Sequence, residues 1–176
     1  MTPAPYYRDV RTHKNSRRWA ALVCGLVMLS AAACDRGSHP HEIGKPAPDF
    51  NISDGTSSIH LASYRGQVVL LNFWASWCPP CIEETPSLLQ FHHAHPEYPI
   101  LAVSIDENEA AYRRFLVQKH FDLNTVWDPK QTVATEYAVT GWPETFIIDR
   151  QGQIRRRFIS AQDWNDPEIL RYLKTL

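Results

Sequence analysis

The sequence predicts an α/β domain in which a mixed β-sheet is covered by helices on both faces. Two nearly continuous apolar runs, at 67–73 and 100–105, are typical of central strands that are buried on both sides. Residues 145–149 and 154–159 predict two further strands joined by a hairpin turn at 150–153. A β-α-β half is thus followed by a β-β-α half, an order compatible with a mixed sheet between helices.

The other expected elements follow the chain in order. Residues 50–60 predict a short hairpin, because two short strands flank the turn sequence Asp54-Gly55. The stretch 80–95 has a helical pattern, with prolines accepted in its first turn and a kink expected at Pro86. The remaining elements are an amphipathic helix at 108–120, a short strand at 125–128, a helix near 131–137 and a closing helix at 167–176.

Residues 1–34 have the layout of a signal peptide. Five Lys and Arg residues precede an apolar run from Trp19 to Ala33, and small residues lead to Cys34. This run is shorter than the roughly 20 residues of a membrane-spanning helix, which favours export followed by cleavage. Residues 29–34 also resemble a bacterial lipobox, in which Cys34 is the lipidated residue. Ordinary cleavage near Ala33 and an uncleaved short anchor are the alternatives.

Proline and glycine among polar residues predict an extended linker at 35–48, which leaves 49–176 as one domain. We expect this domain to be periplasmic or otherwise extracytoplasmic, and tethered to the cell membrane. The net charge of the chain is −1, but 13 basic and 18 acidic residues follow Cys34. This balance does not fit a nucleic-acid-binding surface, which needs clustered Lys and Arg in excess. The run Arg155–Arg157 is interpreted as a solvated strand face or a charged edge.

A pair of cysteines, Cys78 and Cys81, lies where a buried strand gives way to a helix. The other two cysteines fall in residues 1–34, so this pair can bond only within itself or to a partner. At a helix N-terminus, free N–H groups and the positive dipole end stabilise a thiolate. We therefore predict Cys78 as the nucleophile and the more buried Cys81 as the thiol that resolves a mixed disulfide.

Two prolines between the cysteines modify this chemistry. Pro79 and Pro80 have no N–H group, so fewer backbone donors can hold a Cys78 thiolate, which predicts a less acidic thiol and a more reducing pair. A structural disulfide and half of a zinc site are the alternatives. Zinc needs four ligands, and no second cysteine pair follows residue 34. No metal and no cofactor are expected at this site.

Several longer motifs accompany the cysteine pair. They are Gly44-Lys45-Pro46-Ala47-Pro48-Asp49-Phe50, Leu71-Asn72-Phe73-Trp74-Ala75-Ser76-Trp77-Cys78-Pro79-Pro80-Cys81, Glu84 with Pro86, and Gly141-Trp142-Pro143-Glu144-Thr145-Phe146-Ile147-Ile148-Asp149. From about Ile43 to its end the sequence resembles the TlpA, ResA and DsbE (CcmG) family of membrane-anchored thiol:disulfide oxidoreductases. The resemblance implies a thioredoxin fold, here with an N-terminal β-hairpin extension, and a cis-proline loop beside the cysteines. Pro143 has that position, so the Trp142–Pro143 bond is expected to be cis.

The resemblance also implies roles for single residues. The family's cis-proline loop pairs with an extended substrate segment, so the expected substrate-binding residues are Trp77, Pro79, Pro80, Trp142 and Pro143. Thioredoxins carry a buried Asp where this chain has Asn72, which cannot exchange protons. Glu84 returns to the face of Cys81 after one helical turn and is the expected proton acceptor. Alternatively, Glu84 only complements the helix dipole, as we expect of Glu83.

The predicted function is that of an exported protein-disulfide reductase, with cytochrome c maturation as the first assignment. The resemblance implies oxidised exported proteins such as apocytochrome c as substrates, and a membrane electron donor of the DsbD or CcdA type. A peroxiredoxin-like enzyme shares the motif Pro-Ala-Pro-Asp-Phe, but the Thr or Ser three residues before its reactive Cys is absent, since Ala75 and Cys78 stand there. A copper-binding protein using the cysteines with His92, His93 or His95 is the other alternative.

Overall fold

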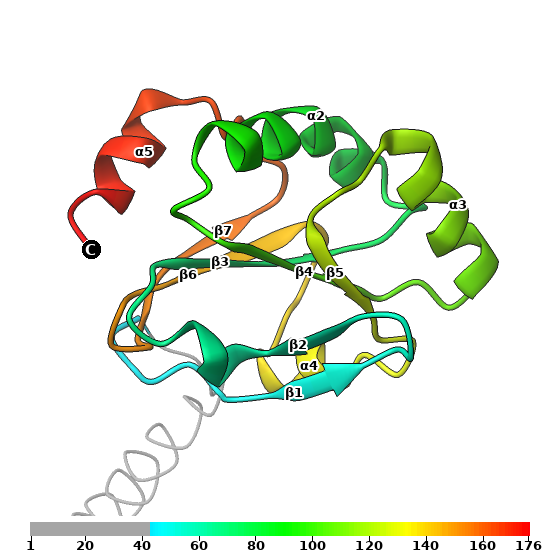
Figure 1. The fold of residues 1–176 in the computed structure, drawn as a ribbon, viewed down its shortest axis with the longest axis horizontal. Coiled ribbons are helices and arrows are strands. Elements are labelled where there is room, and N and C mark those ends of the chain that lie inside the picture. The colour runs from blue at the N-terminus through cyan, green and yellow to red at the C-terminus, as the bar shows by residue number, and fades with distance from the viewer. Residues whose placement is uncertain (1–42) are drawn as a thin grey trace, which may run out of the picture. The chain divides into compact units, whose positions relative to one another are not determined.

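The computed structural model describes residues 43–176 (Figure 1). Within this range it contains no helix with both the length and the apolar character needed to cross a membrane. Residues 1–34, with Cys34, lie outside the described part of the chain. The elements are β1 (Asn51–Ser53), β2 (Ser58–His60), the 3-10 helix η2 (Leu61–Tyr64), β3 (Val69–Trp74), α2 (Pro79–Ala94), β4 (Ile100–Ser104), α3 (Glu109–Lys119), β5 (Asn124–Trp127), α4 (Thr132–Glu136), β6 (Glu144–Ile148), β7 (Ile154–Ile159) and α5 (Pro167–Leu173).

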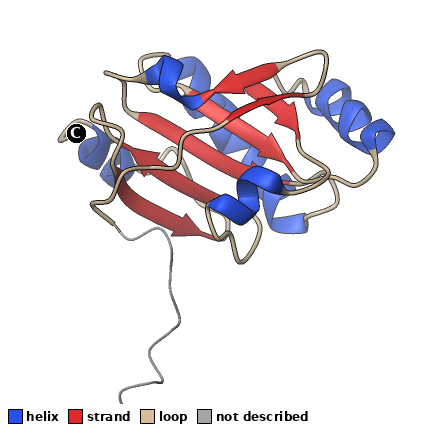
Figure 2. Ribbon diagram, turned by 90° about the horizontal axis from the view of Figure 1, so that it is seen from below, coloured by secondary structure: helices blue, strands red, loops and turns tan. Residues whose placement is uncertain are grey.

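Five strands form one mixed sheet in the order β5-β4-β3-β6-β7. β3 pairs in parallel with β4 and antiparallel with β6, so it is the central strand. Helices α2, α3 and α5 cover one face, and α4 lies on the other face with the β1–β2 hairpin (Figures 1 and 2). The mixed sheet, the covering helices and the N-terminal hairpin confirm the predicted thioredoxin-like fold class.

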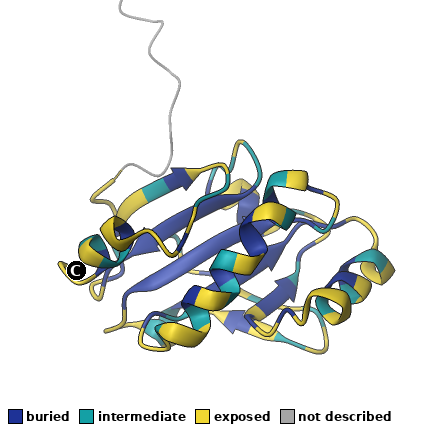
Figure 3. Ribbon diagram, turned by 90° about the horizontal axis from the view of Figure 1, so that it is seen from above, coloured by how far each residue is buried: buried dark blue, intermediate teal, exposed yellow. Residues whose placement is uncertain are grey.

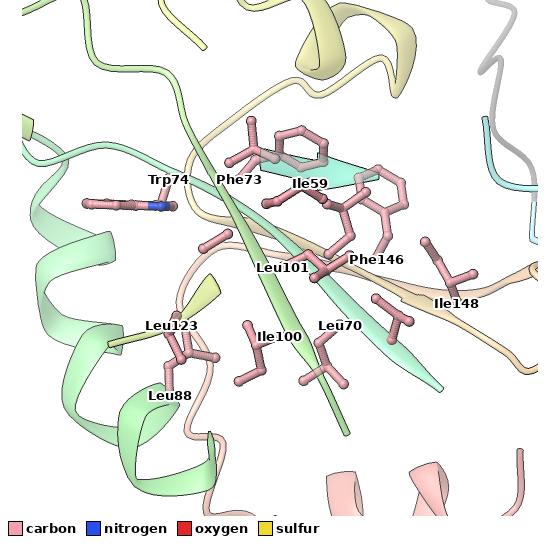
Figure 4. Close-up of a cluster of buried hydrophobic side chains, with 14 of the residues drawn as sticks. Ile59, Leu70, Phe73, Trp74, Leu88, Ile100, Leu101, Leu123, Phe146 and Ile148 are labelled. Atoms are coloured by element: carbon pink, nitrogen blue, oxygen red, sulfur yellow. The ribbon is translucent and has the colours of Figure 1, made fainter. Parts of the chain in front are cut away.

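Both faces of β3 are buried, as its apolar sequence predicts. Side chains alternate along a strand, so Leu70 points to one face of the sheet and Phe73 to the other. Figure 4 shows Leu70 beside Ile100, on the side where Leu88 of α2 lies, whereas Phe73 lies with Phe146 and Ile59 of the hairpin. The helices above the sheet bury one side each and expose the other (Figure 3). The core therefore consists of two layers, with β3 between them.

Part of the expected linker contacts the folded domain. Gly44 donates a backbone hydrogen bond to Ile154 (2.6 Å), and Ala47 donates one to Gly152 (2.9 Å). Ala47 is buried, and Pro46 forms an isolated bridge with Gln153. Residues 44–48 therefore lie along the β6–β7 hairpin, because their backbone groups find partners on that exposed edge.

Helix α2 continues through Pro86 to Ala94. Its first turn contains two prolines, which fit there because the first N–H groups of a helix have no partner within it. The start of α3 is capped by a side chain, because Asn108 Oδ1 accepts the N–H of Ala111 (2.9 Å). The hydroxyl of Thr85 donates to the carbonyl of Cys81 (2.7 Å), a bond that ties the first two turns of α2 together.

We expect Leu70→Ala to lower the free energy of unfolding by about 2–5 kcal/mol, because it leaves a cavity at a fully buried position of β3. Urea unfolding with the disulfide intact measures this change. Val117→Ala on α3 is the matched control, because Val117 is 75% exposed. Its expected effect is within about 0.5 kcal/mol. Equal effects of the two substitutions would contradict the packing described for β3.

Candidate active site

Cys78 and Cys81 are joined by a disulfide at the start of α2. Cys78 is the N-cap residue, and its Sγ accepts the N–H of Cys81 (3.2 Å). Pro79 and Pro80 supply no N–H, so the Cys81 amide is the first helical donor that reaches this sulfur. Both cysteines are buried, with exposed fractions of 3% and 2%. The expected difference in burial between them is therefore small in the disulfide form.

The loop from β3 to Cys78 is held by Asp106, a buried residue just after β4. Asp106 accepts the backbone N–H of Ser76 at Oδ2 (2.9 Å) and the Ser76 hydroxyl at Oδ1 (2.5 Å). The hydroxyl of Ser104 also donates to Asp106 (2.7 Å). Sequence reasoning missed this residue. The sequence feature that could have identified Asp106 is an acidic residue just after a buried strand, at the sheet edge where β3 also ends.

Glu84 lies inside the protein, between α2 and the sheet. One carboxylate oxygen accepts the indole N–H of Trp164 (2.7 Å) and the N–H of Gln162 (3.1 Å). The other accepts the side-chain amide of Asn72 (3.4 Å). Burial disfavours the charged carboxylate and outweighs these three hydrogen bonds, so the pKa of Glu84 rises to about 7. A carboxyl group with this pKa can accept or release a proton near neutral pH.

The Trp142–Pro143 peptide bond is cis, as predicted. Register places Pro143 at the same sheet edge as the cysteines, because Glu144 pairs with Phe73 near the end of β3. Pro143 is buried and Trp142 is partly exposed. Trp77, just before Cys78, is 56% exposed. The structure therefore places the expected substrate-binding residues at one edge of the sheet.

A buried ion pair follows the cis-proline. Glu144 is fully buried and forms an ion pair with Arg157 of β7. Arg157 also donates to the Thr140 hydroxyl (3.1 Å), and Glu144 accepts the Thr140 N–H (3.3 Å). The prediction of a solvated strand face or a charged edge is confirmed for the exposed Arg155 and Arg156 of the edge strand β7. It is wrong for Arg157, which is partly buried and pairs with Glu144. The pair connects β6, β7 and the loop before Pro143.

The remaining aromatic and histidine candidates lie in different parts of the domain. Trp74 is core, stacked on Phe121 with ring centroids 4.6 Å apart. His92 and His93 lie in the last turn of α2, whereas the cysteines lie in its first turn. At about 1.5 Å of rise per residue, roughly 16 Å separates Cys81 from His92. One copper ion cannot be held by both, so the copper alternative in that form is wrong.

Comparison with known proteins agrees with this geometry. Residues 43–157 match the model of the AhpC/TSA family. The chain is 31% identical over 138 residues to the thiol-disulfide oxidoreductase ResA of Bacillus thuringiensis strain Al Hakam, covering 77% of this chain and 79% of ResA. The chain belongs to the AhpC/TSA family as a ResA- and DsbE-like thiol-disulfide oxidoreductase. ResA of Bacillus subtilis strain 168 is likewise 31% identical over 136 residues, covering 76% of each chain.

Solved structures are similar to this ResA- and DsbE-like oxidoreductase. A Chlorobium tepidum protein described as a DsbE-type thiol:disulfide interchange protein superposes with a TM-score of 0.69 at 31% identity, covering 77% of this chain and 96% of that one. StoA of Bacillus subtilis superposes with a TM-score of 0.61 at 26% identity, covering 73% and 99%. The names of these relatives describe disulfide exchange. They distinguish this chain from the peroxiredoxin-like alternative, which shares the motif Pro-Ala-Pro-Asp-Phe at residues 46–50.

We expect Glu84 to make the protein less stable as pH rises from about 4.5 to 7. The unfolded chain releases this proton near 4.5 and the folded chain near 7, so the folded state binds more protons in that window. The contribution is about 3 kcal/mol. Urea unfolding of the oxidised protein at pH 5 and pH 8 measures it as the difference between wild type and Glu84→Gln.

Glu83→Gln is the control, because Glu83 is the exposed neighbour on the same turn. It should retain the wild-type loss of stability between the two pH values. A Glu84→Gln variant that loses stability with pH as steeply as the wild type would show that this carboxyl group does not titrate in that range.

Proposed function

We propose that the chain reduces disulfides of exported proteins with the Cys78–Cys81 pair, and that Glu84 accepts the proton of Cys81. The observation that carries this proposal is the buried carboxyl group of Glu84, one helical turn from Cys81, which accepts hydrogen bonds from Trp164, Gln162 and Asn72. Its burial raises the pKa to about 7. A proton acceptor works best when its pKa is near the working pH. Among the buried residues of α2, Glu84 is the one with a carboxyl group, and its pKa lies near neutral pH.

In the proposed reaction the pair begins as two thiols. The Cys78 thiolate attacks a substrate disulfide, forms a mixed disulfide and releases one substrate thiolate, which takes up a proton. Glu84 then accepts the proton of Cys81, whose thiolate attacks Cys78 Sγ and releases the second substrate thiolate. Two electrons pass to the substrate, and the Cys78–Cys81 disulfide remains. A dithiol electron donor must return the pair to its reduced form.

The surface around the cysteines supports recognition of an extended segment. Trp77 offers an exposed aromatic ring on one side, and the loop with Trp142 and Pro143 lies at the same sheet edge. Pro79 is exposed and Pro80 is partly exposed, and both lie between the two cysteines in the sequence. A chain segment added along the cis-proline loop would gain backbone hydrogen bonds without requiring one side-chain sequence. We assign these five residues to substrate binding.

The physiological setting completes the proposal. Residues 1–34 would export the chain and tether it outside the cytoplasmic membrane, by lipidation of Cys34 or as an uncleaved anchor. An electron donor of the DsbD or CcdA type would then recharge the cysteine pair. Apocytochrome c, whose haem-binding cysteines must be reduced before haem attachment, is the proposed first substrate. The likeness to proteins named ResA and DsbE supports this choice.

We expect the reduction potential of the pair to lie near the roughly −270 mV of thioredoxin. The physical reason is that two prolines remove N–H donors that would stabilise the Cys78 thiolate. Equilibration of the full chain against glutathione or dithiothreitol buffers gives the value. A potential near the roughly −120 mV of a strong oxidant would reverse the proposed direction of electron transfer.

We expect Cys81→Ala to accumulate a mixed disulfide with its substrate, because the resolving thiol is missing. Incubation with oxidised apocytochrome c, followed by non-reducing electrophoresis, detects the covalent complex. Cys78→Ala is the matched control and should form no such complex, since Cys81 lies inside the helix. Trapping by Cys78→Ala instead would exchange the roles of the two cysteines.

Within the proposed mechanism, Glu84→Gln should slow resolution of the mixed disulfide by about 10²-fold or more at pH 7, the usual contribution of a positioned proton acceptor. Stopped-flow tryptophan fluorescence measures this step, and Glu83→Gln serves as the control. The wild-type rate should rise with pH through the pKa of Glu84, while the variant should lack that rise. Equal rates and equal pH profiles would remove Glu84 from the reaction.

A further inference from the structure

A second group of polar side chains lies at the opposite end of α2. His92 and His93 belong to its last turn, and Asp122 lies in the loop between α3 and β5. Within residues 43–176, these are the side chains whose metal-ligating atoms come together, all within 4.8 Å of one another. The disulfide takes no part in this cluster. Any property of the cluster is therefore independent of the proposed function.

The contacts of the cluster show that two of its members already face each other. His93 Nε2 lies 2.7 Å from Asp122 Oδ2. The carboxylate oxygen of Asp122 is thus directed at an imidazole nitrogen. Both atoms are groups that can ligate a cation placed between them.

His92 contributes a different observation. Its Nδ1 is buried and has no hydrogen-bond partner in the described structure. A buried polar atom without a partner costs about 1–3 kcal/mol. The ring centroid of the neighbouring His93 lies 5.4 Å away. One nitrogen of each ring lies within 4.8 Å of the other. Nothing in the described residues therefore competes for the imidazole of His92.

The position at the end of a helix also favours a cation. The C-terminal end of a helix carries about half a negative charge, because its last carbonyl groups have no partner within the helix. His92 and His93 lie in that last turn, and Asp122 adds a full negative charge from a separate segment. Positive charge is stabilised here by the backbone as well as by the side chains.

We propose that His92, His93 and Asp122 bind a divalent transition-metal ion of the Zn²⁺ class. Two imidazoles and one carboxylate are ligands that Zn²⁺ accepts, with a water in the fourth position. Metal–ligand bonds of about 2.0–2.1 Å in a tetrahedron place ligand atoms about 3.3 Å apart. The pair at 2.7 Å must open slightly, and ligand atoms that lie up to 4.8 Å apart must move closer, which exposed side chains such as His93 and Asp122 allow. The bound ion would fasten the end of α2 to the α3–β5 loop.

The test is titration of the full chain with Zn²⁺ by isothermal calorimetry, with the Cys78–Cys81 disulfide intact so that these thiols do not compete. The chain also contains His13, His39 and His41, so the informative quantity is the difference between variants. His93→Ala and Asp122→Asn should each lose one binding equivalent or weaken it by more than about tenfold. His60→Ala is the matched control, because His60 forms a similar exposed pair with Asp49 (3.7 Å).

Two further readouts make the result independent of any single variant. Co²⁺ should give visible absorption bands typical of a nitrogen- and oxygen-ligated site, and His92→Gln should change them. Zn²⁺ should raise the melting temperature of the wild type and of His60→Ala, but not of His93→Ala or Asp122→Asn. Unchanged Zn²⁺ binding in His93→Ala and Asp122→Asn, or an equal loss in His60→Ala, would overturn the proposal. Equal melting temperatures of the wild type and the variants without metal would show that the substitutions leave the fold intact.

Discussion

The position of the disulfide depends on one strand that has no free face. β3 is hydrogen-bonded on both edges and covered on both faces, and all of its residues are buried. A shift of its register by one residue would turn Asn72 and Trp74 to the wrong layer. Because β3 leads into the loop at 75–78, the cysteines are fixed relative to the whole sheet. Asp106 and Pro143 reach the same edge for the same reason, since β4 ends there and β6 begins there.

Glu84 shows how two opposing effects set one property of the site. Hydrogen bonds from Trp164, Gln162 and Asn72 favour the carboxylate, whereas burial favours the neutral acid, and burial has the larger effect. Two of the donors come from the segment before α5, which is distant in sequence from the cysteines. That segment thus contributes to the environment of α2, and a change there would alter the charge of Glu84 without touching the cysteines.

The sequence was sufficient for the features that local pattern determines. The apolar run of β3 and the cysteine spacing at a strand–helix junction each predicted what the structure contains. The cis Trp142–Pro143 bond was expected from the family resemblance instead. Contacts that depend on strand pairing were not predictable in this way. Arg157 meets Glu144 only because β7 pairs with β6 in one register, and residues 44–48 find partners only on the assembled hairpin edge. The place of Asp106 just after a buried strand was a signal in the sequence, but its contact with Ser76 depends on the parallel pairing of β4 with β3.

Helix α2 links the two candidate sites, yet its length keeps them electrostatically apart. Its N-terminal end suits a thiolate and its C-terminal end suits a cation, in agreement with the direction of the helix dipole. At about 1.5 Å per residue, the 16 residues of α2 span roughly 24 Å. The Debye length at physiological salt is about 8 Å, and the metal cluster is exposed on one side, so its charge is largely screened before it reaches the cysteines. A metal at His92, His93 and Asp122 would therefore act on the packing of α2 against the α3–β5 loop rather than on the potential of the disulfide.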